Sequence, residues 1–324
     1  MALPILWVGM DVHKDFVMIA VFRGRATTPL YLEKVNFDPN RLRRFFQRLA
    51  DQGEIRSCYE ASGAGCVLHR WMVAWGYVCD LIAPSLIPSK AGDRRKHDKR
   101  DAIQLARLYR AGELTTIHIP TDAEESVRDL VRCRETFQRE ILKSRHYILK
   151  FLRRRGFVFR EGQNWTARHF EWLRRLHNER TLSREDKTVF GEYLALLEYK
   201  IDRRDELDRQ IEALAITKPY RSGVETLRCF RGIDTHSAMV LETEIGDWMR
   251  FENPQQLMAY LGLVPSEDSS GDRRRQGSIT KAGNSHCRHV LVQAAWSYRH
   301  RPTIGAALRV RQQGQPLDVV AHAW

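Results

Sequence analysis

The sequence predicts an α/β domain at the N-terminal end, a long helical segment in the middle and a mainly α-helical C-terminal segment. Three observations support this prediction. Up to about residue 120, short apolar runs typical of strands alternate with stretches of helical periodicity. Apolar residues then recur at helical spacing among many charged ones, and later short helical stretches are separated by segments rich in Gly, Ser and Arg. We therefore expect three domains, 1–120, 121–216 and 217–324.

The order of the N-terminal elements indicates the fold. Residues 5–22 are typical of two buried strands separated by a polar turn at 13–15. The next expected elements are a strand at 30–36, a helix at 38–50 capped by Asp38, a strand at 55–59, a helix at 65–75, a strand at 77–82 and a helix that begins at Asp98. Three strands followed by helix, strand, helix, strand and helix is the order of a ribonuclease-H-like fold.

Four carboxylates fall where this fold brings distant segments together. Asp11 ends the first strand and Glu60 follows the fourth, and these two strands lie side by side in the fold. Asp98 and Asp101 share the first-turn face of the last helix, which packs across the strand ends. Such a cluster could hold two Mg²⁺ ions about 4 Å apart, as two-metal phosphoryl transfer requires. An acidic first turn also suits the helix dipole, so the Asp98 pair alone does not decide between the two interpretations.

The composition indicates a globular protein with a polyanionic partner. Hydrophobic residues make up 43% of the chain and the formal net charge is +13, which favours nucleic acid as the partner. Six cysteines without a CxxC pair suggest neither a zinc site nor a disulfide framework, as expected in a reducing cytoplasm. The sequence shows no leader peptide and no run of roughly 20 apolar residues, so we expect a cytoplasmic protein without membrane contact.

The middle segment predicts two long helices, at 123–155 and 183–215, with a shorter one near 165–176. Their apolar spacing is typical of an antiparallel hairpin or of a coiled coil between chains. We interpret the segment as a coiled-coil arm for homo-oligomerisation, with an excess of basic residues that also suits a phosphate backbone. A solvated helix face would have the same composition.

The C-terminal segment combines a helix-hairpin-helix-like stretch with a basic loop. Around Gly232 an apolar turn separates two helical stretches, and such hairpins offer backbone N–H groups to phosphate. From 261 onward a loop profile continues until a helix resumes near Asn284, and residues 271–311 hold nine Lys and Arg against one Asp. A serine among arginines is suited to bind and attack a phosphodiester. Ordinary turns in a basic loop would give the same pattern.

Both ends of the chain resemble a family of insertion-sequence transposases that join a RuvC-like domain with an Asp-Glu-Asp-Asp tetrad to a C-terminal serine transposase domain. Members of this family are described as bridge-RNA-guided recombinases. The N-terminal resemblance rests on Val8-Gly9-Met10-Asp11-Val12-His13-Lys14, Tyr59-Glu60 and Asp98-Lys99-Arg100-Asp101-Ala102. The C-terminal resemblance rests on Gly262-Leu263-Val264-Pro265, Ser270-Gly271, Gly277-Ser278-Ile279, Lys281-Ala282-Gly283-Asn284 and Arg288.

The resemblance implies that Asp11, Glu60, Asp98 and Asp101 bind Mg²⁺ and that a serine forms a covalent bond to DNA. Ser270 directly precedes Gly271 and is the expected nucleophile, with Ser269 as the alternative. The residues expected to bind nucleic acid are Arg273, Arg274, Arg275, Lys281, Asn284 and Arg288. The implied partners are donor and target DNA, a structured noncoding RNA that selects the sequences, and further copies of the chain in a dimer or tetramer at the nucleoid.

Three other interpretations fit part of the sequence. A Holliday-junction resolvase would use the same carboxylates with water as the nucleophile. A noncatalytic nucleic-acid-binding protein would not need all four carboxylates. A sugar-kinase-like or actin-like ATPase needs a second Gly-rich phosphate loop, and we find none after the first domain. The run ending at Trp324 has no helix stop signal, which suggests either a longer natural chain or a Trp324 that packs as the last residue.

Overall fold

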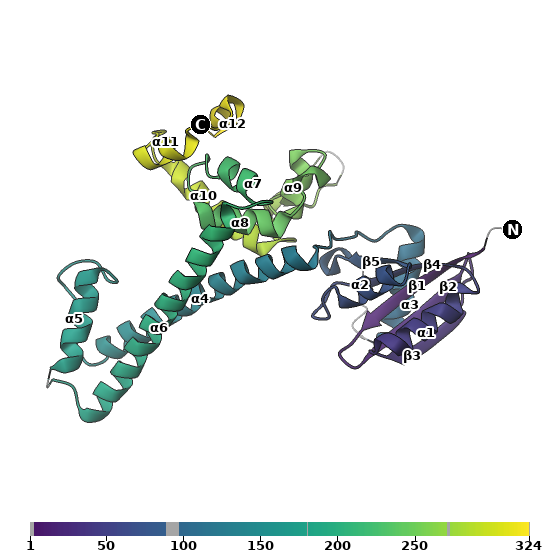
Figure 1. Cartoon of the computed structure of the whole chain (residues 1–324), viewed down its shortest axis with the longest axis horizontal. Helices are drawn as coiled ribbons and strands as arrows, with labels where there is room; N and C mark the ends of the chain where they lie inside the picture. The colour runs from purple at the N-terminus through teal and green to yellow at the C-terminus, as the bar shows by residue number, and fades with distance from the viewer. Residues whose placement is uncertain (1–2, 89–96, 180, 271–272, 324) are drawn as a thin grey trace. The chain divides into compact units, whose positions relative to one another are not determined.

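The computed structural model describes residues 3–88, 97–179, 181–270 and 273–323 (Figure 1). The chain forms two compact units, Met1–Ile119 and Pro120–Trp324. The finer division of the second unit into 121–216 and 217–324 stays a prediction, and Trp324 lies outside the described residues. Among the helices that the structure describes, none combines the length and the apolar character needed to cross a lipid bilayer.

The first unit is built on a five-stranded sheet with the order β3-β2-β1-β4-β5. Its strands are β1 (Ile5–Val12), β2 (Phe16–Arg23), β3 (Tyr31–Asn36), β4 (Glu54–Glu60) and β5 (Val78–Ile82). The first three strands pair antiparallel, whereas β4 pairs in parallel with both β1 and β5. This mixed sheet and its helices confirm the predicted ribonuclease-H-like α/β fold of the N-terminal domain.

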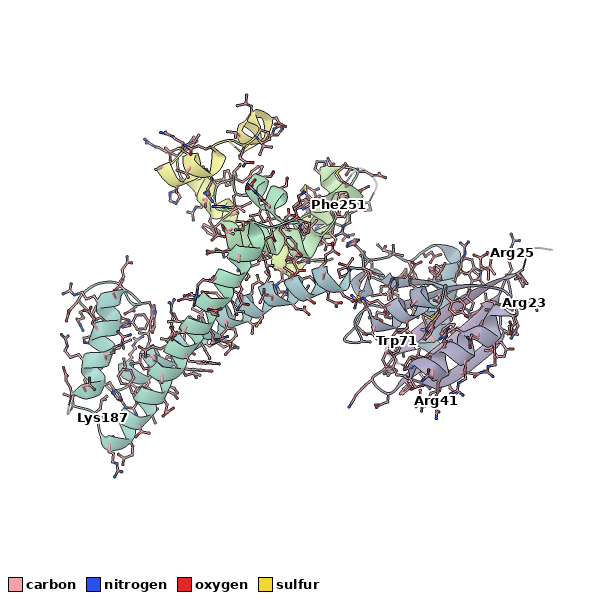
Figure 2. All side chains as sticks on the ribbon, in the orientation of Figure 1. Arg23, Arg25, Arg41, Trp71, Lys187 and Phe251 are labelled. Atoms are coloured by element: carbon pink, nitrogen blue, oxygen red, sulfur yellow. The ribbon has the colours of Figure 1, made fainter. Side chains whose placement is uncertain are left out.

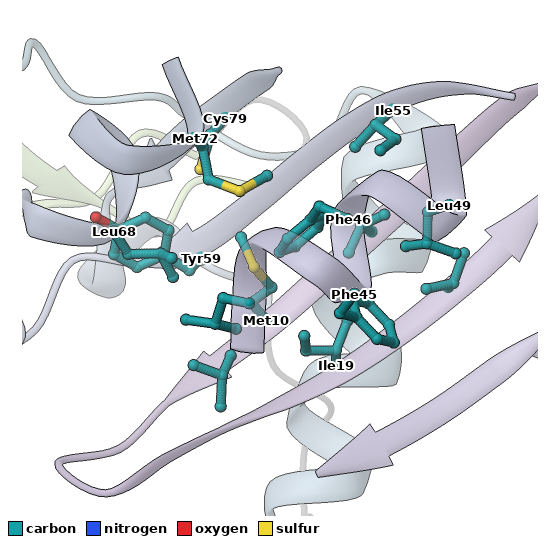
Figure 3. Packing of buried hydrophobic residues seen from close by; sticks show 14 of the residues in the cluster. Met10, Ile19, Phe45, Phe46, Leu49, Ile55, Tyr59, Leu68, Met72 and Cys79 are labelled. Atoms are coloured by element: carbon teal, nitrogen blue, oxygen red, sulfur yellow. The ribbon is translucent and has the colours of Figure 1, made fainter. Parts of the chain in front are cut away.

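One face of the sheet is covered by α1 (Pro39–Ala50) and α2 (Val67–Ala74), with the short helix η1 (Pro84–Leu86) after β5. Asp38 caps α1 as predicted, because its side chain accepts a hydrogen bond from the backbone N–H of Arg41. The apolar side of α1 packs on the sheet, whereas Arg41 is exposed (Figure 2). Figure 3 shows this core, to which the strands contribute Met10, Ile19, Ile55 and Tyr59.

The opposite face is covered by α3 (Asp98–Ala111), which packs on β1, β2 and β4. Side chains of a strand alternate between the two faces, so Met10 and Tyr59 point toward α1 and α2 while Gly9 and Cys58 point toward α3. The α3 helix ends at Gly112, whose φ of 72° is the left-handed conformation that glycine favours. The first turn of α3 carries Asp98 and Asp101.

The second unit begins with two long helices, α4 (Asp122–Arg153) and α6 (Arg184–Ala215), and α5 (Ala167–Asn178) lies between them in sequence. The two long helices run antiparallel, because Arg134 bonds to Asp208 while Lys200, earlier in α6, bonds to Ser144, later in α4. Thr121 and Glu124 form a capping box that starts α4. The antiparallel hairpin is thus present within one chain, and a coiled coil between chains stays a prediction.

The helices of the C-terminal part are α7 (Arg221–Leu227), α8 (Thr235–Ile245), η2 (Trp248–Arg250), α9 (Pro254–Tyr260), α10 (Ser285–Trp296), η3 (Ser297–Arg299), α11 (Ala306–Gln312) and α12 (Leu317–His322). Of these, α8 is buried along most of its length and packs on α4, α6, α7 and α10. A turn through Gly232, with a φ of 77°, leads from α7 toward α8. Asn253 caps α9 and Asn284 caps α10, and the helix that was predicted to resume near Asn284 is present.

The segment before α10 is not an irregular loop throughout. Two short strands, β6 (Pro265–Glu267) and β7 (Gln276–Ile279), pair antiparallel as a hairpin. The expectation of a continuous loop is therefore wrong for these residues. Their side chains are almost all exposed, so no alternation of buried and exposed residues marks the strands in the sequence. Backbone hydrogen bonds hold this hairpin together.

Candidate active site

The carboxyl ends of the two central parallel strands place two carboxylates side by side. The pairing of β1 with β4 runs up to Met10 opposite Tyr59, and the next residues are Asp11 and Glu60. Neighbouring strands lie about 4.8 Å apart. By the alternation of side chains, Asp11 and Glu60 both lie on the face that α3 covers, opposite to Met10 and Tyr59. The predicted juxtaposition of these two strand ends is present.

The first turn of α3 carries the other two carboxylates. Asp98 lies one helical turn before Ala102, which packs on β1, and Asp101 lies one turn before Leu105, which packs on β4. Asp98 is therefore on the β1 side of the helix and Asp101 on the β4 side. We refer to the four carboxylates as the acidic cluster, which consists of Asp11, Glu60, Asp98 and Asp101.

His13 links two members of the acidic cluster. Its Nε2 lies 3.0 Å from Oδ2 of Asp11 and 3.5 Å from Oδ2 of Asp98. One ligand atom from each of the three residues lies within 4.8 Å of the others. The side chains of Asp11 and Asp98 are 25% and 45% exposed, so both are accessible from solvent. Oxygen ligands at this spacing fit a divalent metal, with an imidazole nitrogen as a further ligand.

Glu60 and Asp101 are not members of this group of three residues. Glu60 is exposed at the end of β4, and Asp101 is half-buried at the start of α3. Within the described part of the chain, the group that meets the spacing for a shared metal contains neither of them. Strand order and helix phase place them beside Asp11 and Asp98, and their part in metal binding stays a prediction.

Two residues beside His13 carry no signal in the sequence patterns. The ring of Phe16 stacks on the imidazole of His13 with 4.5 Å between the centroids. The ammonium group of Lys34 lies 3.6 Å from the centroid of the Phe16 ring. These contacts depend on the cross-strand pairing of β1, β2 and β3, which the apolar periodicity of each strand does not reveal. Only the register of the β1–β2 and β2–β3 pairings shows that Phe16 and Lys34 lie beside His13.

Ser269 and Ser270 lie beyond β6 in the hairpin and differ in their contacts. The hydroxyl of Ser269 donates to Oε1 of Glu267 at 2.8 Å and accepts from the backbone N–H of Arg275 at 3.1 Å. Ser270 is exposed, and its hydroxyl makes no hydrogen bond with the residues that the structure describes. The second residue of the Ser-Gly step, Gly271, lies outside the described residues. The choice between the two serines as nucleophile stays a prediction.

The six residues predicted to bind nucleic acid fall into two groups. The exposed ones project from the hairpin and the loop that follows it, and they are Arg273, Arg274, Arg275 and Lys281. The other two also contact the protein itself. Nη1 of Arg288 donates to the carbonyl of Leu261 at 2.7 Å, and Asn284 caps α10 while its Nδ2 donates to Glu244 at 2.7 Å. The fold does not test whether these six residues bind nucleic acid, so their role stays a prediction.

Glu244 anchors the start of α10 to the long helices. It is 5% exposed and accepts two hydrogen bonds from the guanidinium of Arg132, at 2.6 and 2.8 Å. Burial would raise the pKa of Glu244, but the hydrogen bonds from Arg132 and Asn284 outweigh it and hold the pKa below its usual range. His286 contacts Glu135 nearby. This network fixes the end of the loop that follows the hairpin with the two serines.

Comparison with known protein families gives two matches. A model described as "Transposase IS116/IS110/IS902 family" matches residues 224–308. A second transposase model, for the DEDD type of IS110, matches residues 8–155 and so spans all four members of the acidic cluster. The second match covers most of the sheet of the first unit and the whole of α4. The first match covers the hairpin, α10 and the predicted serine.

Two relatives are similar along nearly the entire chain, and a third is similar over about three quarters of it. A putative transposase, y4qE, of Sinorhizobium fredii is 36% identical over 320 residues, which cover 98% of this chain and 78% of the relative. The transposase for insertion sequence element IS1533 of Leptospira borgpetersenii is 31% identical over 322 residues, 98% of this chain and 92% of the relative. The pilin gene-inverting protein of Moraxella lacunata is 27% identical over 245 residues, 73% of this chain and 65% of the relative.

Proposed function

The chain belongs to the IS116/IS110/IS902 family of transposases and is a DNA transposase, and from this premise we propose that the acidic cluster is its Mg²⁺-dependent strand-cleaving centre. The contact of His13 with both Asp11 and Asp98 carries this proposal, because it brings ligand atoms from a strand and a helix within bonding reach of one ion. Bound Mg²⁺ would neutralise charge on the phosphate and on the leaving oxygen. Asp11, Asp98 and the other two carboxylates would hold and orient the phosphodiester there.

In the same proposal the hydroxyl of Ser270 is the nucleophile. Its oxygen forms a bond to phosphorus, the bond from phosphorus to one strand breaks, and the leaving oxygen takes up a proton while the serine proton passes to water. A hydroxyl from another strand then reverses the reaction and frees the serine. Ser270 is exposed and its hydroxyl makes no hydrogen bond with any described residue, which supports Ser270, whereas Ser269 is held by Glu267 and by the backbone of Arg275. Arg273 and its neighbours supply positive charge for the phosphate.

We also propose that the serine and the acidic cluster act together across a homo-oligomer. Mixed oligomers test this sharply. Asp11→Asn and Ser270→Ala variants are each expected to be inactive. When the two are co-expressed, one intact centre forms if the carboxylates of one chain work with the serine of its partner. Co-expression that restores no exchange would place both groups in one chain.

A structured noncoding RNA is the proposed source of sequence choice. The basic loop suits a phosphate backbone of any sequence, and contacts to phosphate do not by themselves select a sequence. The test is excision of the element in cells with and without the noncoding DNA beside the gene. Excision that persists after deletion of that DNA would contradict RNA guidance.

The alternative is a Holliday-junction-resolvase type of cleavage, in which water replaces serine. The acidic cluster alone would suffice for it. The Ser270→Ala and Ser269→Ala variants, with Asp101→Asn as the metal-site variant, separate the two reactions. We expect Asp101→Asn and Ser270→Ala to abolish both the covalent protein–DNA adduct and strand exchange, and Ser269→Ala to retain them. Cleavage that survives in Ser270→Ala without an adduct would favour the resolvase reaction. The Moraxella relative is named a pilin gene-inverting protein, and inversion of a gene requires strand exchange, which supports the serine reaction over cleavage alone.

A further inference from the structure

A lysine of the edge strand lies on the same face of the sheet as the acidic cluster. Asp11 of β1 pairs with Met18 of β2, and Met18 pairs with Lys34 of β3. Residues paired across strands share a face, so Lys34 and Asp11 both lie on the side that α3 covers. Two strand spacings separate their backbones, which is about 10 Å. The position of Lys34 relative to the cluster is therefore set by the register of two hairpins.

A continuous series of contacts directs the Lys34 side chain toward the cluster. Phe16 pairs with Asn36, two residues beyond Lys34 toward the end of the sheet where Asp11 lies. The ammonium group of Lys34 lies over the Phe16 ring, and that ring stacks on His13. His13 in turn bonds to Asp11. The cation thus leans along β3 toward the carboxylates and is held there by a cation–π contact.

Lys34 has no acidic partner in the described part of the chain. It is exposed, and no described carboxylate oxygen lies within 4.0 Å of its ammonium group. On the β5 side of the same face, the carboxylate of Asp80 accepts a hydrogen bond from the Tyr109 hydroxyl at 2.5 Å. The β3 side therefore presents a positive group and the β5 side a negative one. A negatively charged strand would be favoured over β2 and β3.

We propose that Lys34, held over Phe16, binds a backbone phosphate of the cleaved DNA strand close to the bond that is cut. The inference rests on the proposed function of the acidic cluster. Successive phosphates of one strand are about 3.4 Å apart along the helix axis, so the contact falls within about three nucleotides of the cut. Lys34 acts as a positioning residue, since its ammonium is a point charge for phosphate rather than a group that touches the reacting atoms.

Neutralising single phosphates tests the contact directly. The full chain, with RNA from its own element, is given DNA ends in which one phosphate at a time is replaced by an uncharged methylphosphonate. For the wild type we expect one substitution near the cut to slow single-turnover cleavage by about tenfold, the effect of one charge-assisted hydrogen bond. For Lys34→Ala we expect cleavage about tenfold slower on normal DNA and no further loss at that phosphate.

Further variants separate charge from structure. Lys34→Arg keeps the charge and should retain most of the rate. Phe16→Leu keeps the lysine but removes the ring that holds it, so we expect slower cleavage with an unchanged salt dependence of binding. Lys143→Ala is the matched control, because Glu140 already pairs with Lys143 at 2.6 Å. In an Asp101→Asn background, Lys34→Ala should lower the slope of log affinity against log salt by about one, and Lys143→Ala should not.

Two failures are distinguishable. If Asp11→Asn still cleaves DNA, the proposed function of the acidic cluster is wrong. If Asp11→Asn is inactive but Lys34→Ala shows the same methylphosphonate profile and salt slope as the wild type, only the inference about Lys34 is overturned. Thermal unfolding of each variant is measured alongside, and we expect Lys34→Ala to unfold within about 4 °C of the wild type, since an exposed cation–π contact is weak.

Discussion

Gly9 lies directly under the backbone of α3, where a Cβ atom on Gly9 would stand 2.3 Å from the carbonyl oxygen of Ala102. The same Cβ would be 2.4 Å from the backbone nitrogen of Ala106. A side chain at this position of β1 is excluded by helix backbone, which cannot move aside as a flexible side chain can. The absence of a side chain at Gly9 therefore lets the first turn of α3 approach Asp11.

Gly9→Ala should destabilise the first unit by roughly 3 kcal/mol, because α3 must move away from the sheet. Cleavage should fall as well, since Asp98 and Asp101 move with the helix. Urea unfolding measures the stability. Gly63→Ala is the matched control, because no atom lies within 4 Å of a Cβ built on Gly63. An unfolding midpoint for Gly9→Ala equal to that of the control would show that the close packing is not required.

Much of the first unit could be predicted because its signals are local. Each strand is a short apolar run, Asp38 marks the start of α1, and Asp11 and Glu60 stand where two such runs end. The order of the elements then identifies the neighbours in the sheet. Strand ends and helix phase, which sequence spacing reports directly, predicted the proximity of Asp11 and Asp98, whereas the part of Glu60 and Asp101 in the cluster stays a prediction.

The contacts that were not predicted depend on register between strands. Phe16 and Lys34 meet because β2 and β3 pair with Phe16 opposite Asn36, and no spacing within either strand encodes that alignment. The β6–β7 hairpin was missed for a different reason. Its side chains are exposed almost throughout, so the pairing leaves no hydrophobic pattern to detect. The side-chain contacts of Asn284 are likewise long-range, to Glu244, or made with the backbone of His286 and Cys287.

Asn284→Asp should separate helix capping from the contact with Glu244. Aspartate caps a helix as well as asparagine does, so the hydrogen bonds to the first turn of α10 are kept. The donor that faces Glu244 becomes a second carboxylate oxygen, and at pH 8 we expect a loss of about 2 kcal/mol. The loss should shrink toward pH 5, because two adjacent carboxylates raise one another's pKa and one then takes up a proton.

Urea unfolding of the Asn284 variants at both pH values is the measurement. Asn284→Ser provides the control, since it keeps a neutral cap and loses only the donor to Glu244. Its stability should not depend on pH more than that of the wild type. A loss in Asn284→Asp that grows toward low pH would contradict the carboxylate pair. Full stability of Asn284→Ser with weaker DNA binding would instead support the predicted contact with nucleic acid.

Acidification should destabilise the α5 region through His169. Its side chain is fully buried, and its Nδ1 accepts a hydrogen bond from the backbone N–H of Trp165 at 3.0 Å. Burial lowers the pKa of His169 below the ordinary value of 6.5. The unfolded chain therefore takes up a proton below about pH 6.5 that the folded chain accepts only at a lower pH, and stability is lost as the pH falls below about 6.5.

The free energy of unfolding is compared between pH 7.5 and pH 5.5. The loss on acidification should be smaller in His169→Gln, which has no proton to gain, than in the wild type. His146→Gln is the matched control, because His146 is exposed on α4. Equal acid sensitivity in the wild type and His169→Gln would assign the effect to other groups.

Mg²⁺ should stabilise the folded chain through the acidic cluster. An ion that binds only the folded state adds about 2.7 kcal/mol at a hundredfold excess over its Kd, so the unfolding temperature should rise with Mg²⁺ concentration and fall again with a chelator. Asp11→Asn removes one of the ligand atoms grouped with His13 and Asp98, and it should abolish the response. Asp80→Asn is the matched control, because its carboxylate lies on the same face but bonds to Tyr109, and it should keep the response. A rise of the same size in Asp11→Asn would place the stabilising ion elsewhere, even if cleavage were lost.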